Sequence, residues 1–198
     1  KEFQDLRKDY VSGDLSLDSL NADPLAQLNL WLKDAVERDV PEPTAMALST
    51  VAPSGAPHSR MVLLKGLERG GLVFYTNYNS GKGRDVAANP QVSVLFFWPL
   101  LERQVRVEGV AQKVAPEVSE AYFTSRPRES KLGALASPQS SVVESYEYLE
   151  ETWLKLKEEF EGKEVPRPAH WGGYIIRPLV FEFWQGGRGR LHKRFRYR

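Results

Sequence analysis

The C-terminal part of the sequence carries the densest group of side chains that could bind an anionic ligand. The run FWQGGRGRLHKR, from Phe183 to Arg194, combines an indole, two adjacent glycines, several cations and an imidazole. From Arg177 to Arg198 there are seven Arg or Lys residues and His192 against a single acid, Glu182, so the local field is positive. A basic tail for nucleic acid or a membrane is one interpretation, but the β-rich pattern and the aromatic residue favour a rigid site.

Two pairs of side chains lie on segments with strand character. On an extended segment Arg190 and His192, two residues apart, would point to the same side. In HSRMVLLKG, strand alternation places Arg60 and Lys65 on opposite faces unless a bulge intervenes, so they could serve two different anions. The alternative is that Arg60 and Lys65 are ordinary cations at the end of a strand, in contact with water.

Two further segments could bind phosphate through a helix start or a helix face. A strand runs into a Ser/Gly-rich turn with a predicted helix start at Ser80, where free N–H groups and Lys82 form a candidate phosphate site. Tyr122 and Arg126 lie four apart on one helix face, with Ser130 just beyond, and this set suits a phosphate monoester. Solvated turns and an incidental Tyr–Arg contact are the alternatives. A polar loop adds two hydrogen-bonding side chains, Gln139 and Ser140.

The composition excludes several classes of chemistry. The net charge of +1, from 27 basic and 26 acidic residues, argues against a general nucleic-acid-coating protein. The sequence has no cysteine, which excludes disulfides, thiolate metal sites and a cysteine nucleophile. The three histidines are widely spaced and lack metal-ligand spacing, and no GxSxG, GxGxxG or P-loop motif is present. We expect no metal, no nucleic acid and no membrane, and a cytoplasmic location.

Helical periodicity marks the first element and two later ones. Asp23 and Pro24 are typical of a helix start, and Leu25, Leu28, Trp31, Leu32 and Val36 recur at helical spacing after them. Residues 116–136 are predicted to be helical and broken by Pro127. Residues 144–162 form a charged helix whose stripe Leu149, Trp153, Leu156 and Phe160 is expected to face inward.

Short β runs with turn residues between them fill most of the remaining sequence. They include TAMALSTVA, HSRMVLLK, LVFYTN, QVSVLFFW and RQVRVEGVAQKV, and two more, WGGYIIR and LVFEFWQG, precede the basic end. The pattern predicts a mainly β domain (α+β) over residues 1–198, with peripheral helices, a lead segment over 1–22, and five to seven strands in a small antiparallel barrel.

Eight motifs in order resemble the pyridoxine (pyridoxamine) 5′-phosphate oxidase family: RMVLLKG, FYTNYNSGKG, NPQVSVLFFW, ERQVRVEG, YFTSRP, SPQSS, WGGY and EFWQGGRGRLHKR. The resemblance covers nearly the whole chain, including LRKDY in the lead segment. It implies an FMN-binding split β-barrel homodimer with two FMN sites at the subunit interface. It also implies that pyridoxine or pyridoxamine 5′-phosphate loses a hydride from C4′ to the flavin and becomes pyridoxal 5′-phosphate, while O2 reoxidises the flavin and gives H2O2.

The resemblance also implies a role for each matching residue. The expected FMN contacts are Arg60, Met61, Val62, Leu63, Tyr75, Thr76, Lys82, Gln104, Gln139, Ser140, Trp184 and Arg194. The expected contacts to the substrate phosphate are Lys65, Tyr122, Arg126 and Ser130. Arg190 and His192 are expected over the substrate ring as the catalytic pair, and Arg7 and Tyr10 of the lead segment are expected to close over it.

The sequence departs from the family pattern at two places. Members usually have Ser-Arg-Lys where this chain has Ser80, Gly81 and Lys82, so one phosphate-binding cation is replaced by glycine. We expect weaker FMN retention unless a neighbour such as Arg84 substitutes for it. Members also continue past RFRYR to an end near Arg-Leu-Ala-Pro, whereas this sequence stops at Arg198.

Three other functions compete with this reading. A flavin-binding relative of the same fold could act on another ligand, but it would be expected to lack the Tyr122, Arg126 and Ser130 set and the Arg-Leu-His element. A β-barrel RNA-binding module would use the basic end and exposed aromatic residues. A protein that stores pyridoxal 5′-phosphate without turnover would have the same residues as the oxidase.

Overall fold

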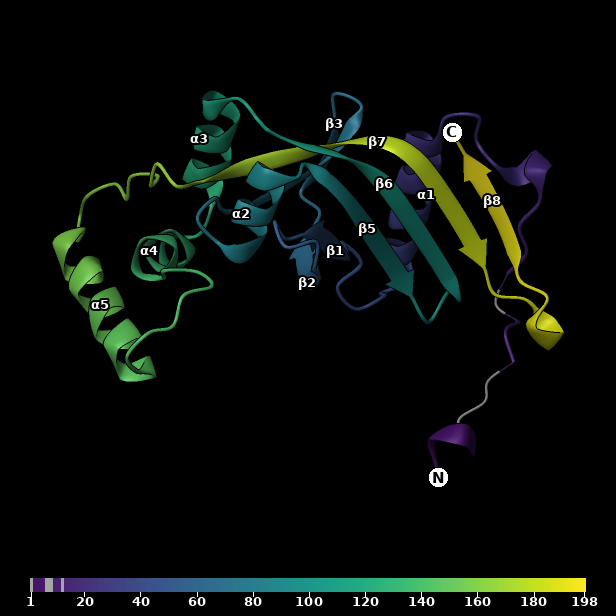
Figure 1. The fold of residues 1–198 in the computed structure, drawn as a ribbon, viewed down its shortest axis with the longest axis horizontal. Helices are drawn as coiled ribbons and strands as arrows, with labels where there is room; N and C mark the ends of the chain where they lie inside the picture. The colour runs from purple at the N-terminus through teal and green to yellow at the C-terminus, as the bar shows by residue number, and fades with distance from the viewer. Residues whose placement is uncertain (1, 6–8, 12) are drawn as a thin grey trace.

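The computed structural model describes residues 2–5, 9–11 and 13–198 of the chain. Its strands are β1 Ala45–Val51, β2 Pro57–Leu63, β3 Gly66–Glu68, β4 Gly71–Asn77, β5 Gln91–Trp98, β6 Arg103–Lys113, β7 Trp171–Gln185 and β8 Lys193–Tyr197. They form one antiparallel sheet in the order β2-β1-β5-β6-β7-β4-β3, and β8 pairs with the C-terminal half of β7. The sheet curls into a half-barrel (Figure 1), which confirms the predicted antiparallel architecture, with eight strands instead of five to seven.

The long strand β7 corrects the prediction of two separate β runs. WGGYIIR and LVFEFWQG form one strand of 15 residues, with Pro178 inside it. Pro178 pairs where the register with β6 shifts between Glu108 and Gly109, so the residue without an N–H lies at an irregularity of the ladder. A Cβ on Gly109 would lie 2.3 Å from the carbonyl oxygen of Arg177, and this close approach of two strands therefore requires glycine.

Helix α1, Pro24–Glu37, begins as the sequence predicts. The Asp23 carboxylate accepts a hydrogen bond from the Leu25 N–H at 2.9 Å, and Pro24 occupies the first turn. One of the apolar residues that recur at helical spacing does not pack inward, because Val36 is 56% exposed and Ala35 is buried in its place. The apolar residues that α1 buries follow the spacing i, i+3, i+4 and i+7: Leu28, Trp31, Leu32 and Ala35.

The other helices are α2 Gly81–Ala88, α3 Pro116–Ser125, α4 Arg128–Ala136 and α5 Tyr146–Glu159, with short 3-10 turns η1 Phe3–Asp5, η2 Leu17–Ser19 and η3 Arg188–Arg190. The predicted break at Pro127 separates α3 from α4. Helix α5 packs on α4 at the edge of the molecule (Figure 1), and its predicted inward stripe is only half-buried, with no fully buried residue in the helix. An edge helix with a single neighbour has little apolar surface to cover it.

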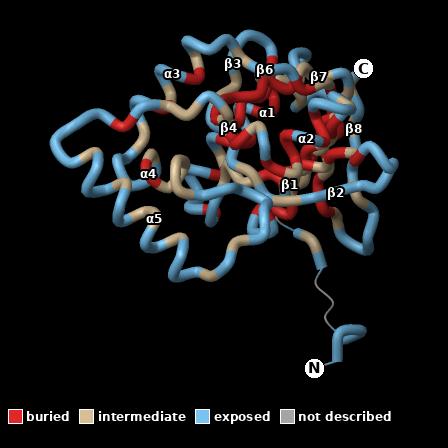
Figure 2. The backbone as a smooth tube through the Cα atoms, turned by 60° about the vertical axis from the view of Figure 1, so that its left-hand side comes forward, coloured by how far each residue is buried: buried red, intermediate tan, exposed pale blue. Residues whose placement is uncertain are grey.

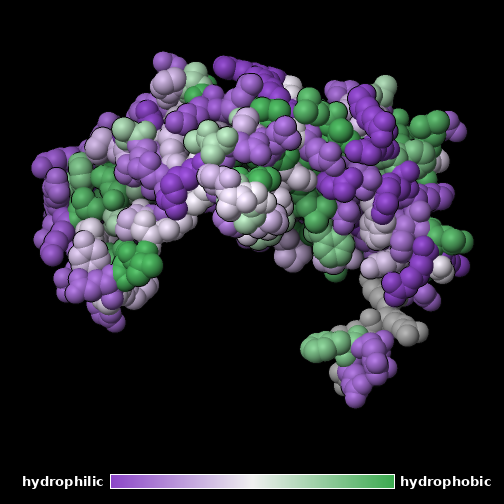
Figure 3. Space-filling model, in the orientation of Figure 1, coloured by the Kyte–Doolittle hydropathy of each residue, from purple (hydrophilic) through white to green (hydrophobic). Residues whose placement is uncertain are grey.

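The core lies between the curled sheet and α1 (Figure 2). Trp31 of α1 makes edge contacts with Trp98 of β5 and Phe183 of β7, with ring centroids 6.4 and 5.2 Å apart. Arg103 also fixes α1 to the sheet, because it pairs with Asp34 and lies over the Trp31 ring. Outside the core, apolar residues lie in separate patches between hydrophilic ones on the face drawn in Figure 3.

Candidate active site

A cavity of about 460 Å³ opens between the β2 and β4 strands, helices α3 and α4, and the first residue of β7. It brings together most of the predicted site residues of the chain's first two thirds. Those predicted to contact FMN are Met61, Val62, Leu63, Tyr75, Thr76, Lys82 and Gln139. Those predicted to contact the substrate phosphate are Lys65, Tyr122, Arg126 and Ser130.

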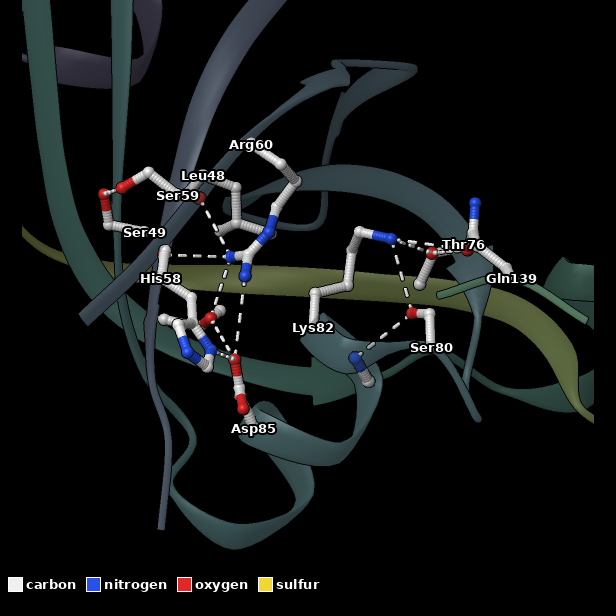
Figure 4. Close-up of polar contacts among 12 residues, drawn as sticks. Leu48, Ser49, His58, Ser59, Arg60, Thr76, Ser80, Lys82, Asp85 and Gln139 are labelled. Atoms are coloured by element: carbon white, nitrogen blue, oxygen red, sulfur yellow. Dashed lines mark hydrogen bonds and ion pairs between the residues drawn. The ribbon is translucent and has the colours of Figure 1, made fainter. Parts of the chain in front are cut away.

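Lys82 is a buried cation on the cavity wall, and no acidic side chain pairs with it among the described residues. Its Nζ donates to three neutral oxygens, Thr76 Oγ1 at 3.2 Å, Ser80 Oγ at 3.3 Å and Gln139 Oε1 at 3.3 Å (Figure 4). Burial, with a smaller contribution from the nearby charge of Arg60, lowers the pKa of Lys82 below its usual value. An anion at this position would remove the cost of burying an unpaired charge.

Helix α2 starts where the sequence predicts, and its first turn presents Lys82. The Ser80 hydroxyl accepts a hydrogen bond from the Gly83 N–H at 3.3 Å and so caps the helix. A Cβ on Gly83 would lie 2.1 Å from the Tyr78 carbonyl oxygen, which shows how tightly this turn packs on the preceding loop. A Cβ on Gly81 would meet only Ser140, at 3.8 Å, so a larger side chain fits there.

Arg60 is directed to a buried carboxylate and lies outside the cavity lining. Its Nη1 donates to the Leu48 carbonyl at 3.0 Å and to Thr50 Oγ1 at 2.7 Å, and its Nη2 lies 3.6 Å from Asp85 Oδ2 (Figure 4). Asp85 also accepts from Thr50 and contacts the His58 ring, and its pKa is lowered by these hydrogen bonds against the opposing effect of burial. The charge of Arg60 is therefore largely neutralised within the protein.

The cavity lining also contains a group of aromatic residues and, beside them, Arg126. The rings of Tyr75 and Tyr122 stack at 3.8 Å, and the Trp171 ring lies nearly parallel to both. The Arg126 guanidinium lies 4.6 Å from the Trp171 ring centroid, and its buried Nη1 has no hydrogen-bond partner. The cavity thus contains three cations without a counter-charge among the described residues: the buried Lys82, the half-buried Arg126 and the exposed Lys65.

The C-terminal candidates form a separate cluster at the other end of β7. The His192 ring lies 4.7 Å from that of Trp184, and the ring of Tyr10 makes edge contacts with both. In the strand register Gln104 pairs with Trp184 and Trp184 with Arg194, so these three residues form one row across β6, β7 and β8. Arg7, the other lead-segment residue predicted to close over the substrate, lies outside the described residues.

The prediction that Arg190 and His192 share an extended segment is wrong. Arg190 ends the η3 turn with a φ of 64°, and Gly189 before it also has a positive φ. Arg190 is exposed, whereas His192 is half-buried with its Nδ1 accepting a hydrogen bond from the Gly187 N–H at 3.2 Å. Arg194 pairs with Glu182 at 3.5 Å. The Gly-rich stretch allows a turn that simple strand alternation does not anticipate.

The cavity and the C-terminal cluster do not meet within one chain. None of Tyr10, Gln104, Trp184, Arg190, His192 and Arg194 lines the cavity. Trp171 and Trp184 are 13 positions apart on the same strand, which at about 3.3 Å per residue is roughly 40 Å along β7. Ser140 is also outside the lining, on a loop beside the start of α2.

Several residues that line the cavity were not predicted from the sequence: Asn77, Gly133, Ala134, Ser137 and Trp171. The WGGY motif contains Trp171, but nothing in its spacing relates it to Tyr122 or Arg126. Asp85, which binds Arg60, was also missed, and its place on α2 three residues after Lys82 gave no local signal. Among the described residues there is no group of acids and histidines that could hold a metal ion, and no helix with the length and apolar character to cross a membrane.

Comparison with known families decides the classification. Residues 32–157 match the family model described as pyridoxamine 5′-phosphate oxidase, and residues 171–198 match the pyridoxine 5′-phosphate oxidase C-terminal dimerisation region. The chain belongs to the pyridoxine/pyridoxamine 5′-phosphate oxidase family. This confirms the resemblance seen in the sequence motifs. The matched dimerisation region coincides with β7, η3 and β8, and it supports a homodimer.

Relatives of this oxidase family cover the whole chain. A pyridoxine/pyridoxamine 5′-phosphate oxidase of Rubrobacter xylanophilus is 49% identical over 197 residues, covering 100% of this chain and 91% of the relative. One of Leptospira biflexa is 53% identical, covering 96% and 89%. A solved structure of PhzG from Burkholderia lata in complex with tetrahydrophenazine-1-carboxylic acid is 29% identical, with a TM-score of 0.88 over 94% of this chain and 93% of that one.

Proposed function

We propose that this protein is an FMN-dependent oxidase of phosphorylated B6 vitamers. It would convert pyridoxine 5′-phosphate or pyridoxamine 5′-phosphate to pyridoxal 5′-phosphate, with the C4′ hydride transferred to the flavin and O2 reduced to H2O2. The observation that carries this proposal is the presence in one cavity of two separate cations, Lys82 and Arg126, that are buried or half-buried with no acid paired to them among the described residues. Cofactor and substrate each bring one phosphate, so two anion sites are what this reaction requires.

The residues around Lys82 suit the FMN phosphate. Three neutral acceptors already hold the buried ammonium in place. A phosphate would supply the negative charge that this site lacks. The wall beside it offers apolar and aromatic surface for a flavin ring from Met61, Val62, Leu63 and Tyr75. Arg60 would have to leave Asp85, Thr50 and the backbone carbonyls to bind the phosphate, since these groups engage its donors and balance its charge.

The residues around Arg126 suit the substrate phosphate. Lys65, Tyr122 and Ser130 line the cavity with it, and together they supply two cations and two hydroxyl groups. A phosphate monoester has three oxygens that accept charge-assisted hydrogen bonds, which this set of donors can satisfy. The protein would therefore hold the substrate by its phosphate and leave the ring free to lie against the flavin.

The C-terminal cluster would complete the site from the second subunit. The dimerisation region contains Trp184, Arg190, His192 and Arg194, none of which lines the cavity of its own chain. Exposed apolar side chains at the cavity rim, among them Met61 at 62%, provide surface for a partner to cover. We therefore place each FMN site between the cavity of one chain and the cluster of its partner.

The hydrogen bond from Gly187 assigns the protons of His192. Because the Gly187 N–H donates to Nδ1, the neutral ring carries its own proton on Nε2 and presents that atom as a donor. The Trp184 and Tyr10 rings hold the imidazole in place. His192 is thus suited to donate a hydrogen bond to a substrate oxygen or nitrogen over the flavin.

The test is a visible absorption spectrum of the purified protein, followed by an assay of substrate turnover. The purified protein, loaded with FMN if it is colourless, should release hydrogen peroxide and pyridoxal 5′-phosphate when pyridoxine 5′-phosphate is added in air. Pyridoxine without phosphate is the matched control, and it should react far more slowly because it cannot use Arg126 or Lys65. A protein that remains colourless and inert with added FMN would defeat the proposal, and a protein that binds the vitamers without turnover would have a storage function.

Gly81→Arg is expected to tighten FMN binding about tenfold. A charge-assisted hydrogen bond contributes about 1.5–3 kcal/mol, and the open space at Gly81 beside Lys82 accommodates the longer side chain. The dissociation constant can be measured from the quenching of FMN fluorescence by the apoprotein. Gly81→Gln is the control, since it adds length and helix propensity without charge. Equal affinities of Gly81→Arg and wild type would mean that Arg84 or another cation already serves this phosphate.

Alanine at Arg190 or His192 should impair substrate binding or turnover more than FMN retention. Alanine at Trp184 or Arg194 should act mainly on FMN, because these two share the register row with Gln104. We expect changes of about tenfold or more in the affected constant, the value of one charged hydrogen bond. Steady-state KM and kcat, measured beside the FMN dissociation constant, would separate the two pairs. Equal effects of all four variants on both ligands would refute this division.

A further inference from the structure

Trp171 is the aromatic residue of the cavity lining to which the proposed roles assign no function. It is the first residue of β7, paired in register with Asn77 of β4, and only 6% of its surface is exposed. Its ring forms part of the cavity wall. The main-chain carbonyl of Trp171 accepts a hydrogen bond from Arg167 at 2.6 Å, and this contact fixes the start of the strand.

The indole of Trp171 is the principal support of Arg126. The guanidinium carbon lies 4.6 Å from the Trp171 ring centroid and 5.5 Å from that of Phe123. No acidic side chain pairs with Arg126 among the described residues, and its buried Nη1 has no hydrogen-bond partner. Burial lowers the pKa of Arg126, although the nearby Tyr122 opposes the shift. A cation in this setting is held by aromatic faces rather than by an anion.

This manner of holding an arginine differs from that of Arg60 in the same molecule. Arg60 is held by the Asp85 carboxylate and by backbone carbonyls, which occupy its N–H groups and balance its charge. An aromatic face attracts the cation through the flat side of the guanidinium and leaves the in-plane N–H groups available. Arg126 therefore keeps both its charge and its donors for a ligand in the cavity.

The same indole also orders the neighbouring tyrosines. The Trp171 ring is nearly parallel to those of Tyr75 and Tyr122, at 5.6 and 6.2 Å, with interplanar angles of 10° and 5°. Tyr75 belongs to the proposed FMN contacts and Tyr122 to the proposed substrate contacts. Trp171 thus lies beside residues of both proposed ligand sites. Of these neighbours, only Arg126 is a cation that the indole stabilises.

We propose that Trp171 is a positioning residue whose aromatic face holds Arg126 in the cavity with its charge and N–H groups free for the phosphate of the substrate. This proposal deepens the proposed function and rests on its assignment of the substrate phosphate to the Arg126 side of the cavity. Trp171 acts through Arg126 and does not itself contact the reacting atoms.

The test measures binding without turnover. The probe is 4-deoxypyridoxine 5′-phosphate, which has no hydroxyl group at C4′ to oxidise, titrated by calorimetry into the FMN-loaded protein. Trp171→Leu should weaken binding about tenfold, the size of a desolvated cation–π contact, whereas Trp171→Phe keeps an aromatic face and should stay within about threefold of wild type. Trp171→Met, with an unbranched and flexible side chain that fills irregular space but has no π face, replaces Trp171→Leu if that variant does not fold.

Three outcomes would overturn the proposal. Wild-type affinity in Trp171→Leu would show that the indole does nothing for the ligand, and equal losses in Trp171→Phe and Trp171→Leu would show that only the fit of the indole matters. A loss of FMN affinity as large as the loss of probe affinity would mean that the substitution disturbs the whole cavity. Unchanged FMN affinity, measured by fluorescence, is the expected result.

A double-mutant cycle adds a readout that a purely structural role would not change. If Trp171 acts through Arg126, Trp171→Leu should have little further effect on probe binding in an Arg126→Met background. If the double variant weakened probe binding by the product of the two separate effects, Trp171 would act independently of Arg126, and the proposal would fall. The cycle requires only binding, so a protein that binds the probe with this coupling but produces no peroxide would refute the oxidase and leave the role of Trp171 intact.

Discussion

Lys82→Met should make the FMN-free protein more stable and at the same time weaken FMN binding about a hundredfold. The ammonium is buried against three neutral oxygens with no acid paired to it, so its removal relieves a desolvation cost that the apoprotein carries. We expect a gain of about 1 kcal/mol in the free energy of unfolding. The loss of affinity corresponds to a strong charge-assisted hydrogen bond of about 3 kcal/mol. Urea denaturation of the apoprotein and FMN fluorescence titration measure the two quantities.

Lys65→Met is the matched control for that experiment. Lys65 lines the same cavity but is exposed, so removing its charge should not stabilise the apoprotein and should affect the substrate more than FMN. If Lys82→Met proved as unstable as a typical core substitution, the ammonium would have a structural role in holding Thr76 and Gln139. If FMN bound Lys82→Met as tightly as wild type, its phosphate would lie elsewhere.

Two inactive variants should restore activity to each other when they share a dimer. Arg126→Ala changes the cavity, and His192→Ala changes the cluster at the far end of β7. Each alone should lose about a hundredfold or more in kcat/KM. If each site combines the cavity of one chain with the cluster of the other, a mixed dimer has one site with both changes and one with neither. Random pairing makes half of the dimers mixed, so about a quarter of the wild-type activity should return.

The control for this recovery is a pair of variants that both change the cavity. Arg126→Ala mixed with Lys65→Ala should restore nothing, because every cavity in a mixed dimer carries one of the two changes. The subunits are exchanged by refolding the two variants together, and activity is measured before and after. Absence of recovery in the Arg126→Ala and His192→Ala mixture, with mixed dimers demonstrated by two different tags, would contradict the interface location of the site.

The elements that the sequence predicts well are those with local causes. The cap at Asp23, the helix start at Ser80 and the break at Pro127 each depend on residues within one turn, and all three are present. The turn at Arg190 was missed because its positive φ follows from neighbouring glycines and not from side-chain alternation. The continuous strand β7 was missed because a proline in a strand suggests a boundary unless a bulge on the neighbouring strand accommodates it.

The sequence motifs predicted most residues of the candidate site, but not which of its cations have an acidic partner. Motifs identified Arg60, Lys82, Arg126 and Arg194 as cations, yet the sequence cannot tell which of them the protein neutralises. The structure pairs Arg60 with Asp85 and Arg194 with Glu182, contacts that join different elements of the fold. Lys82 and Arg126 remain without an acid among the described residues. The distribution of counter-charges is a long-range property, and it determines where an anion can bind.

The continuity of β7 also constrains how chains of this kind can vary in length. Trp171 lies beside the cavity, where it pairs with Asn77 of β4, and Trp184 lies in the C-terminal cluster, where it pairs with Gln104 of β6, and both belong to the one continuous strand β7. Insertion or deletion of one residue between them would turn one of the two side chains to the other face of the sheet. Chain-length differences among relatives should therefore accumulate in segments such as the connection between α4 and α5, while the distance from Trp171 to Trp184 stays fixed.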